Sequence, residues 1–167
     1  MVKIRPGRIE DDAAAMADIF NHYVRTSTVI FSDTELSAAD MAEKLRRLDV
    51  GSHYPFFVAE AETGAVAGYA YAHAYQSDPV YGRTHELTIY LAPDACGRGI
   101  GRMSLGATIE ACRRNGAHAL IACVTAGNAP SERMFERQGF KLAGVLPEAG
   151  FKFGAYHADA LYHMLLE

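Results

Sequence analysis

The sequence predicts an α/β protein built on one mixed β-sheet that is covered by helices. Two observations carry this prediction. In the middle of the chain, short apolar runs typical of strands alternate with segments whose apolar residues recur at helical spacing, whereas the first part contains two strand-like runs joined by a tight turn. The chain has 167 residues, half of them hydrophobic, and shows no linker or repeat, so we expect a single domain over residues 1–167.

Two helices are expected near the N-terminus. Residues 2–5 are typical of a short strand, and Asp11 and Asp12 are the expected N-cap of the helix that follows. Ser37 and Asp40 have the spacing of a capping box, in which each side chain bonds the other residue's backbone N–H. They predict the start of a second, short amphipathic helix.

The remaining elements follow in alternation. Two more helices are expected, one over residues 101–115 and one that Asn128 caps and Gly139 ends. Gly116 suits the position just after the end of the earlier of these helices. Six further strands are expected, at residues 56–61, 65–75, 84–91, 119–124, 141–146 and 155–166.

Composition excludes several classes of protein. The net charge of −4 leaves no basic footprint for nucleic acid. Cys96, Cys112 and Cys123 are an odd number at wide spacings, so neither a disulfide framework nor a structural metal is expected. The charged N-terminal segment lacks the apolar core of a signal peptide, and no run is apolar enough to cross a membrane. We therefore expect a cytoplasmic protein with no membrane or nucleic-acid partner.

The sharpest local signal is the segment Cys-Gly-Arg-Gly-Ile-Gly, which ends at Gly101 between a predicted strand and a predicted helix. Its glycines allow a tight turn that presents N–H groups to an anion at the positive end of the helix dipole. Arg102 stands where a Walker loop needs lysine, and Ser104 stands where a dinucleotide fingerprint needs glycine. The Q/R-x-x-G-x-G/A loop of acyl-CoA-dependent transferases matches at Gly99 and Gly101. A flexible connector is the alternative interpretation.

Further motifs lie on both sides of this loop in a fixed order. They are Asn21-His-Tyr-Val24, Ser27-Thr28, Phe31, Pro55-Phe56, Gly68-Tyr69, Tyr81-x-x-Thr84-x-Glu86, Tyr90, Asn128-Ala-Pro-Ser131, Phe135, Gly139-Phe140, Gly150-Phe-Lys-Phe-Gly154 and Asp159. With them the chain resembles the GNAT superfamily of N-acetyltransferases and, within it, the phosphinothricin acetyltransferase family. The resemblance covers nearly the whole chain.

The resemblance implies a mostly antiparallel sheet of about seven strands flanked by about four helices, with two central strands that splay apart. It also implies transfer of acetyl from acetyl-CoA to the primary amine of a small amino-acid-like substrate, such as phosphinothricin, methionine sulfoximine or methionine sulfone, and a homodimer. Two alternatives stay open. One is an acetyltransferase for another small amine or a protein N-terminus, and the other is a non-catalytic acyl-CoA sensor.

The same resemblance implies where acetyl-CoA would bind. The splay would lie between residues 87–91 and residues 121–124, and the pantetheine arm would enter it as an added strand does. Asn128 and Ser131 would approach the arm or the sulfur. The implied backbone contacts are Ile89, Tyr90 and Leu91 for the arm, and Arg98, Gly99, Ile100, Gly101 and Arg102 for the pyrophosphate.

Glu86 is the expected general base, because the amine must lose a proton before it can attack the thioester. The family motif places a catalytic carboxylate at this position. A glutamate serves near neutral pH only if burial raises its pKa. His73 and His157 are weaker alternatives, and strand alternation points His85 to the opposite face of the sheet.

Phe31, Tyr81 and Arg83 are the expected substrate-binding residues, and no metal site is expected. The chain departs from the family at two positions. Asp78 stands where relatives often carry a cation that would hold the acidic group of the substrate. Phe135 stands where many GNAT enzymes carry a tyrosine proton donor, so the CoA thiolate is expected to take its proton from water or to leave unassisted.

Overall fold

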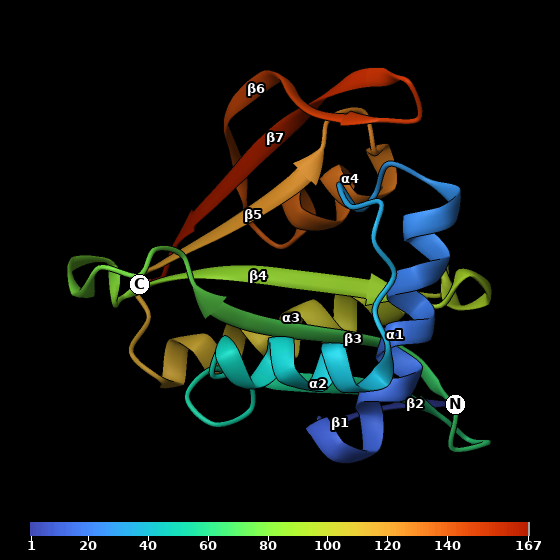
Figure 1. Cartoon of the computed structure of the whole chain (residues 1–167). Coiled ribbons are helices and arrows are strands. Elements are labelled where there is room, and N and C mark those ends of the chain that lie inside the picture. The colour runs from blue at the N-terminus through green and yellow to red at the C-terminus, as the bar shows by residue number, and fades with distance from the viewer. Residues whose placement is uncertain (167) are drawn as a thin grey trace.

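The computed structural model describes residues 1–166, which form a seven-stranded sheet with the order β1-β2-β3-β4-β5-β7-β6 (Figure 1). Neighbouring strands run antiparallel, except for β4 and β5, which run parallel. This confirms the predicted α/β fold. Glu167, the last residue of the predicted domain, lies outside the described residues. The strands are β1 Val2–Pro6, β2 Phe56–Ala61, β3 Val66–Ala74, β4 Thr84–Leu91, β5 Ala119–Thr125, β6 Lys141–Lys152 and β7 Ala155–Leu165.

In residues 1–166 four helices cover the two faces of the sheet. They are α1 Ile9–Thr26, α2 Ala38–Arg47, α3 Ile100–Arg114 and α4 Ala129–Arg137. α1 and α2 pack on one face over an apolar cluster that includes Met16, Leu45 and Tyr69. α3 and α4 contribute to a second cluster on the other face, which includes Leu105 and Phe135. None of these helices is both long and apolar enough to span a membrane.

The first helix begins about one turn earlier than the sequence predicts. Arg8 occupies the N-cap of α1, so the expectation that Asp11 or Asp12 caps it is wrong. Asp12 instead lies within α1 and stabilises its N-terminal end, because its carboxylate accepts the Arg8 N–H at 2.7 Å. The same carboxylate accepts two bonds from the Arg5 guanidinium, at 2.8 and 2.9 Å, and is buried. This ion pair joins β1 to α1.

Other helix ends match the predicted signals. Ser37 and Asp40 form the capping box of α2, with the Asp40 N–H donating to Ser37 Oγ and the Ser37 N–H donating to the Asp40 carboxylate. Gly116 follows the C-cap of α3 with a φ of 79°. Asn128 occupies the N-cap of α4 as expected, but its side chain makes no capping hydrogen bond. That side chain is therefore free for another role.

The strand predicted at residues 141–146 is wrong at its C-terminal end, because β6 continues to Lys152. Its pairing with β7 shifts register between Leu146 and Gly150, where Glu148 has a φ of 53°. The residues that look like a strand end in the sequence form a bulge, and β6 pairs with β7 again from Gly150 onward. β6 is an outer strand of the sheet and most of its residues are exposed.

The parallel strands β4 and β5 separate soon after they meet. Pairing joins them over three residue pairs, Thr84 with Ala119, His85 with Leu120 and Glu86 with Ile121. Beyond this point β4 stays paired with β3 and β5 stays paired with β7. Figure 1 shows the two strands diverging toward their C-terminal ends. The predicted splay between residues 87–91 and 121–124 is present and begins just after Ile121.

Candidate functional site

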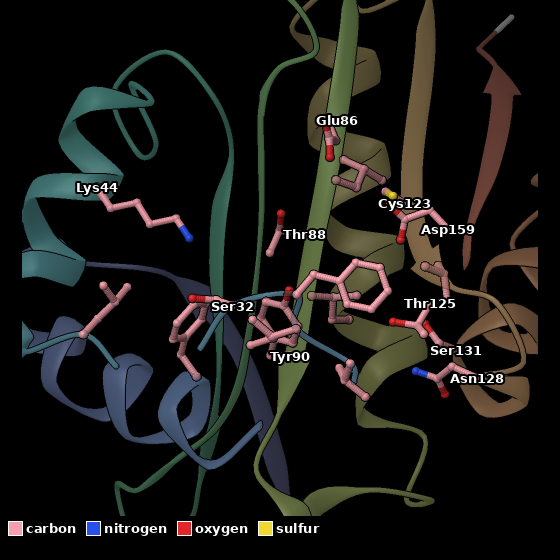
Figure 2. Close-up of a pocket in the computed structure, with 18 of the residues that line it drawn as sticks. Ser32, Lys44, Glu86, Thr88, Tyr90, Cys123, Thr125, Asn128, Ser131 and Asp159 are labelled. Atoms are coloured by element: carbon pink, nitrogen blue, oxygen red, sulfur yellow. The ribbon is translucent and has the colours of Figure 1, made fainter. Parts of the chain in front are cut away.

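A cavity of about 490 Å³ occupies the opening between β4 and β5, on the side of the sheet that α1 and α2 cover (Figure 2). The segment that joins α1 to α2 forms another part of its wall. The residues that line the cavity are Phe20, Val29, Ile30, Phe31, Ser32, Thr34, Leu36, Lys44, Arg47, Glu86, Leu87, Thr88, Ile89, Tyr90, Cys123, Val124, Thr125, Asn128, Ser131, Phe135 and Asp159.

Strand alternation decides which polar groups face this cavity. Glu86 and Thr88 are two residues apart on β4, so they point to the same face of the sheet. On the other side of the opening Thr125 of β5 pairs directly with Asp159 of β7, and Cys123 lies two residues before Thr125. Figure 2 shows these side chains converging from three strands. The site is therefore assembled from both sides of the splay.

The pKa of Glu86 is raised above its ordinary value. Burial is the main cause, the nearby Asp159 charge adds to it, and His73 opposes it. His73 is the cross-strand partner of Glu86 in the pairing of β3 with β4. A carboxyl group with a raised pKa is a stronger base than an exposed glutamate, which suits removal of a proton from an ammonium group.

The other histidines lie elsewhere. His85 is buried on the opposite face of the sheet, as alternation predicts, with its ring 4.9 Å from that of Tyr54. His157 Nε2 lies 2.9 Å from the Lys152 carbonyl oxygen. Neither side chain lines the cavity. Of Glu86, His85 and His157, only Glu86 lines the cavity.

The glycine segment forms an open turn that leads into α3. Gly99 is the N-cap with a φ of 78°, and Gly97 has a φ of 74°. A Cβ atom on either glycine would meet nothing within 4 Å, so the surface above them is open. Arg98 and Arg102 are exposed and join no ion pair within residues 1–166. The first-turn N–H groups of α3 and these cations make an anion-binding surface.

The backbone of β4 also presents free groups to the opening. The Ala92 N–H donates to a β3 carbonyl, and in an antiparallel ladder alternate residues direct their backbone groups to the same neighbour. Tyr90 therefore directs its backbone groups to β3, whereas those of Ile89 and Leu91 point into the opening. The Leu91 carbonyl already accepts a hydrogen bond from the Tyr23 hydroxyl at 2.7 Å. Of the three predicted backbone contacts, Ile89 and Leu91 are the accessible ones.

Asn128 and Ser131 lie where α4 begins, on the β5 side of the opening. Figure 2 shows both side chains beside Thr125 at the edge of the cavity. Since the Asn128 side chain does not cap its own helix, its amide is available to a ligand. The structure thus brings both predicted residues to the same cavity as Glu86.

The segment between α1 and α2 is held firmly against the sheet. The Asn21 side chain donates to the Leu36 carbonyl and accepts the Leu36 N–H, each at 2.8 Å. The buried Lys152 ammonium donates to the carbonyls of Ser27 at 2.7 Å and Ile30 at 2.8 Å, and also to that of Tyr23. These bonds fix one wall of the cavity without any regular secondary structure.

Phe31 is carried by this segment and lines the cavity, as predicted. A Cβ atom at Gly150 would lie 2.6 Å from the Phe31 ring, so only glycine lets the ring lie against β6. The close approach gives a physical reason for the glycine at this position of the motif. Phe31 is the predicted substrate-binding residue that the structure brings to the cavity.

Tyr81 and Arg83 do not reach the cavity in this chain. Tyr81 is exposed and its ring packs against Tyr75. The Arg83 guanidinium donates to the Gly116 carbonyl at 3.1 Å, near the end of α3. The Asp78 side chain accepts the Val80 N–H and caps a single turn.

Three charged cavity residues were not among the predicted site residues. Lys44 and Arg47 come from α2, and Asp159 comes from β7. Lys44 lies three residues after buried Met41, which is the spacing that places it beside the apolar stripe of α2. That spacing is the sequence signal that could have indicated that Lys44 lies at the edge of the buried face of α2. Asp159 belongs to the last of the family motifs, but its place beside the cavity follows from the pairing of β5 with β7.

Comparison with known proteins identifies relatives over almost the whole chain. Residues 16–140 match the Acetyltransferase (GNAT) family. A phosphinothricin N-acetyltransferase from Streptomyces coelicolor is 33% identical over 162 residues, which cover 96% of this chain and 94% of that protein. An L-methionine sulfoximine/L-methionine sulfone acetyltransferase from Pseudomonas aeruginosa is 32% identical over 155 residues, covering 92% and 88%.

The fold also matches a solved structure. The crystal structure of a phosphinothricin acetyltransferase from Sinorhizobium meliloti in complex with acetyl-CoA superposes with a TM-score of 0.93. It is 31% identical in sequence, and the match covers 99% of this chain and 88% of that one.

Proposed function

The chain belongs to the GNAT family of acetyltransferases, and from this premise we propose that it transfers the acetyl group of acetyl-CoA to the primary amine of a small amino-acid-like acceptor. Relatives that cover most of its length act on phosphinothricin, methionine sulfoximine or methionine sulfone, as their names state. The observation that carries the proposal is the one cavity between the splayed strands, which Glu86 lines from β4 and Asn128 and Ser131 line from the β5 side.

The chain fits acetyl-CoA at three places along the opening. The N–H groups of residues 98–102, at the turn that begins α3 and beside the open glycines with positive φ, suit the pyrophosphate. The inward backbone groups of Ile89 and Leu91 suit the amides of the pantetheine arm. Asn128 and Ser131 would then lie beside the thioester end. Bound acetyl-CoA supplies the activated acetyl group, and all other steps fall to the protein and water.

Glu86 is proposed to accept the proton of the acceptor ammonium, directly or through one water molecule. Burial and the Asp159 charge raise its pKa, so the carboxylate takes a proton more readily than an exposed glutamate does. The neutral amine can then attack. Phe135 is buried and has no proton to donate, so the departing thiolate takes its proton from solvent or leaves unassisted.

Phe31 is proposed to close the acceptor end of the cavity. The anchored segment that carries Phe31 forms one wall of the cavity, whose volume of about 490 Å³ suits a small molecule such as an amino acid. Tyr81 and Arg83 stay outside this space in the single chain, so acceptor binding by these two residues is not part of the proposal.

A homodimer is proposed through the exposed outer strand β6 and its hairpin with β7. A long exposed outer strand with apolar side chains is a surface that proteins usually cover. The apolar residues there are Leu142, Val145, Leu146, Phe151, Phe153 and Tyr156, each 45% exposed or more. Sedimentation equilibrium tests this point. A cytoplasmic location is also proposed, since three free cysteines suit a reducing compartment.

Thiol release from acetyl-CoA, measured against a panel of amines, tests the main proposal. We expect steady turnover with phosphinothricin, methionine sulfoximine or methionine sulfone, and little with polyamines or N-terminal peptides. Turnover with peptides alone would favour protein N-terminal acetylation. Acetyl-CoA binding without acetylation of any amine would favour a sensor.

A further inference from the structure

Lys44 and Arg47 place two positive charges on the wall of the cavity. Figure 2 shows the Lys44 side chain reaching from α2 toward β4, on the side of β4 away from Asp159. Its ammonium lies 4.8 Å from the centre of the Phe20 ring, and both residues line the cavity. Within residues 1–166 no carboxylate lies within 4 Å of the Lys44 ammonium.

The charges in the cavity are therefore separated. Glu86 and Asp159 contribute carboxyl groups from β4 and β7, whereas the cations come from α2. A ligand that carries an ammonium group at one end and an acidic group at the other would match both regions. An amino acid with an acidic side chain has this arrangement.

The Arg83 guanidinium, a further cation that could hold an acid, is directed elsewhere. Arg83 bonds the Gly116 carbonyl. Among the described residues that line the cavity, Lys44 and Arg47 are the basic ones.

The surroundings of the Lys44 ammonium also favour an anionic ligand. Burial lowers the pKa of its ammonium, and the neighbouring Arg47 charge lowers it further. Both effects make the charged form less stable than it would be in water. A bound anion would offset both, because it supplies the opposite charge that the site lacks.

We infer that Lys44, with Arg47 beside it, binds the acidic group at the side-chain end of the acceptor and so makes the enzyme prefer amino acids with an anionic side chain. This inference rests on the proposed acetyl transfer. The α-carboxylate of an amino acid is only two bonds from its amine, so it must stay near the reacting end. The side-chain acid lies several bonds farther on and can extend toward α2.

Two acceptors of nearly equal shape test the inference. L-Phosphinothricin and L-methionine sulfone both end in a tetrahedral group with a methyl substituent, but only the phosphinate is charged. Steady-state kinetics are measured for the wild type, Lys44→Met, Lys44→Arg and Arg46→Met. Methionine keeps an unbranched apolar side chain at this position without the charge. Arg46→Met is the matched control, because it removes a cation from the same helix that pairs with Glu10 outside the cavity.

We expect Lys44→Met to raise KM for phosphinothricin roughly tenfold to hundredfold, the usual effect of losing a hydrogen bond to a charged group. KM for methionine sulfone should stay within about twofold of the wild-type value, because the uncharged sulfone loses no charged hydrogen bond. Lys44→Arg should restore most of the affinity, and Arg46→Met should change neither constant. Thermal melting of each variant checks that it is folded.

Three results would overturn the inference while leaving acetyl transfer intact. If the wild type had a lower KM for methionine sulfone than for phosphinothricin, Lys44 would not bind the acidic group of the acceptor. An equal rise in KM for both acceptors would assign Lys44 to the α-carboxylate. No change with either acceptor would leave Lys44 as a surface lysine. If the wild type acetylated neither compound nor any amine of the panel, the proposed function itself would fall, and this inference with it.

Discussion

Glu86 and Asp159 face the same cavity from opposite sides of the opening between β4 and β5 (Figure 2). They are 73 positions apart in the sequence and lie on strands that do not pair with each other. Burial is the main reason that the pKa of Glu86 is raised, and the like charge of Asp159 adds to it. The opening between β4 and β5 therefore has on one side a carboxyl group whose pKa is raised in part by a charge on the other side.

Replacing Glu86 with Gln removes the proposed proton acceptor without changing the side-chain shape. We expect kcat to fall roughly hundredfold to ten-thousandfold, the usual contribution of a general base. The dissociation constant for CoA, measured by calorimetry, should be nearly unchanged. His157→Gln serves as the control, because His157 lies outside the cavity lining and should keep kcat within a few-fold. An unchanged rate in Glu86→Gln would move the base to another group.

The pH dependence of kcat/KM should show the raised pKa of Glu86. Only the ionised carboxylate accepts a proton, so activity is lost as the pH falls through the pKa of Glu86. Since that pKa is raised, the acidic limb should lie at a higher pH than an ordinary glutamate would give. Asp159→Asn removes the like charge, lowers the pKa of Glu86 and should shift the limb to lower pH. If the acidic limb of Asp159→Asn moved to higher pH or stayed in place, the Asp159 charge would not raise the pKa of Glu86.

The proposed binding of the pyrophosphate by the glycine turn can be separated from the effect of this turn on stability. Gly99 and Gly116 flank the same helix, have φ values of 78° and 79°, and have open space where a Cβ would be placed. Alanine at either position should cost about 1 kcal/mol of unfolding free energy, because left-handed backbone disfavours a Cβ. Only Gly99→Ala should also weaken CoA binding, by about fivefold or more. Equal CoA affinity in the two variants would place the pyrophosphate elsewhere.

Lys152 should matter for both stability and acceptor binding. Its ammonium is the shared donor for the carbonyls of Tyr23, Ser27 and Ile30, at the start of the segment that carries Phe31. Lys152→Met leaves these carbonyls without that donor and should lower the free energy of unfolding by about 3 kcal/mol. Urea titration measures this loss, and KM for the acceptor should rise.

Lys141→Met is the matched control, since Lys141 lies exposed at the other end of β6. Its unfolding free energy should change by less than about 0.5 kcal/mol. A similar small change in Lys152→Met would mean that other contacts hold the segment between α1 and α2.

Local signals were enough to predict most of the fold. The capping box at Ser37 and the glycine at position 116 mark helix ends because the bonds involved span only a few residues. The start of α1 was misplaced because Asp12 caps the helix from within while it pairs with Arg5. The end of β6 was misplaced because a bulge near Glu148 resembles a strand end until β7 pairs beyond it.

The cavity was predictable only in part, for a similar reason. Glu86, Asn128 and Ser131 lie in ordered motifs, so the resemblance could point to them. Lys44 and Asp159 reach the cavity through the packing of α2 and the pairing of β5 with β7, which depend on contacts between distant parts of the chain. Tyr81 was expected at the site from its motif alone, yet the short turn capped by Asp78 keeps it outside.

The narrow contact between β4 and β5 has a consequence for synthesis. The strands on each side of the opening come from one stretch of chain, β1–β4 from residues 2–91 and β5–β7 from residues 119–165. During translation the ribosome completes the half that carries Glu86 before it makes the half that carries Asn128. A nascent chain halted between them can therefore display the carboxylate but cannot enclose a thioester, so activity appears only when the last strands have emerged.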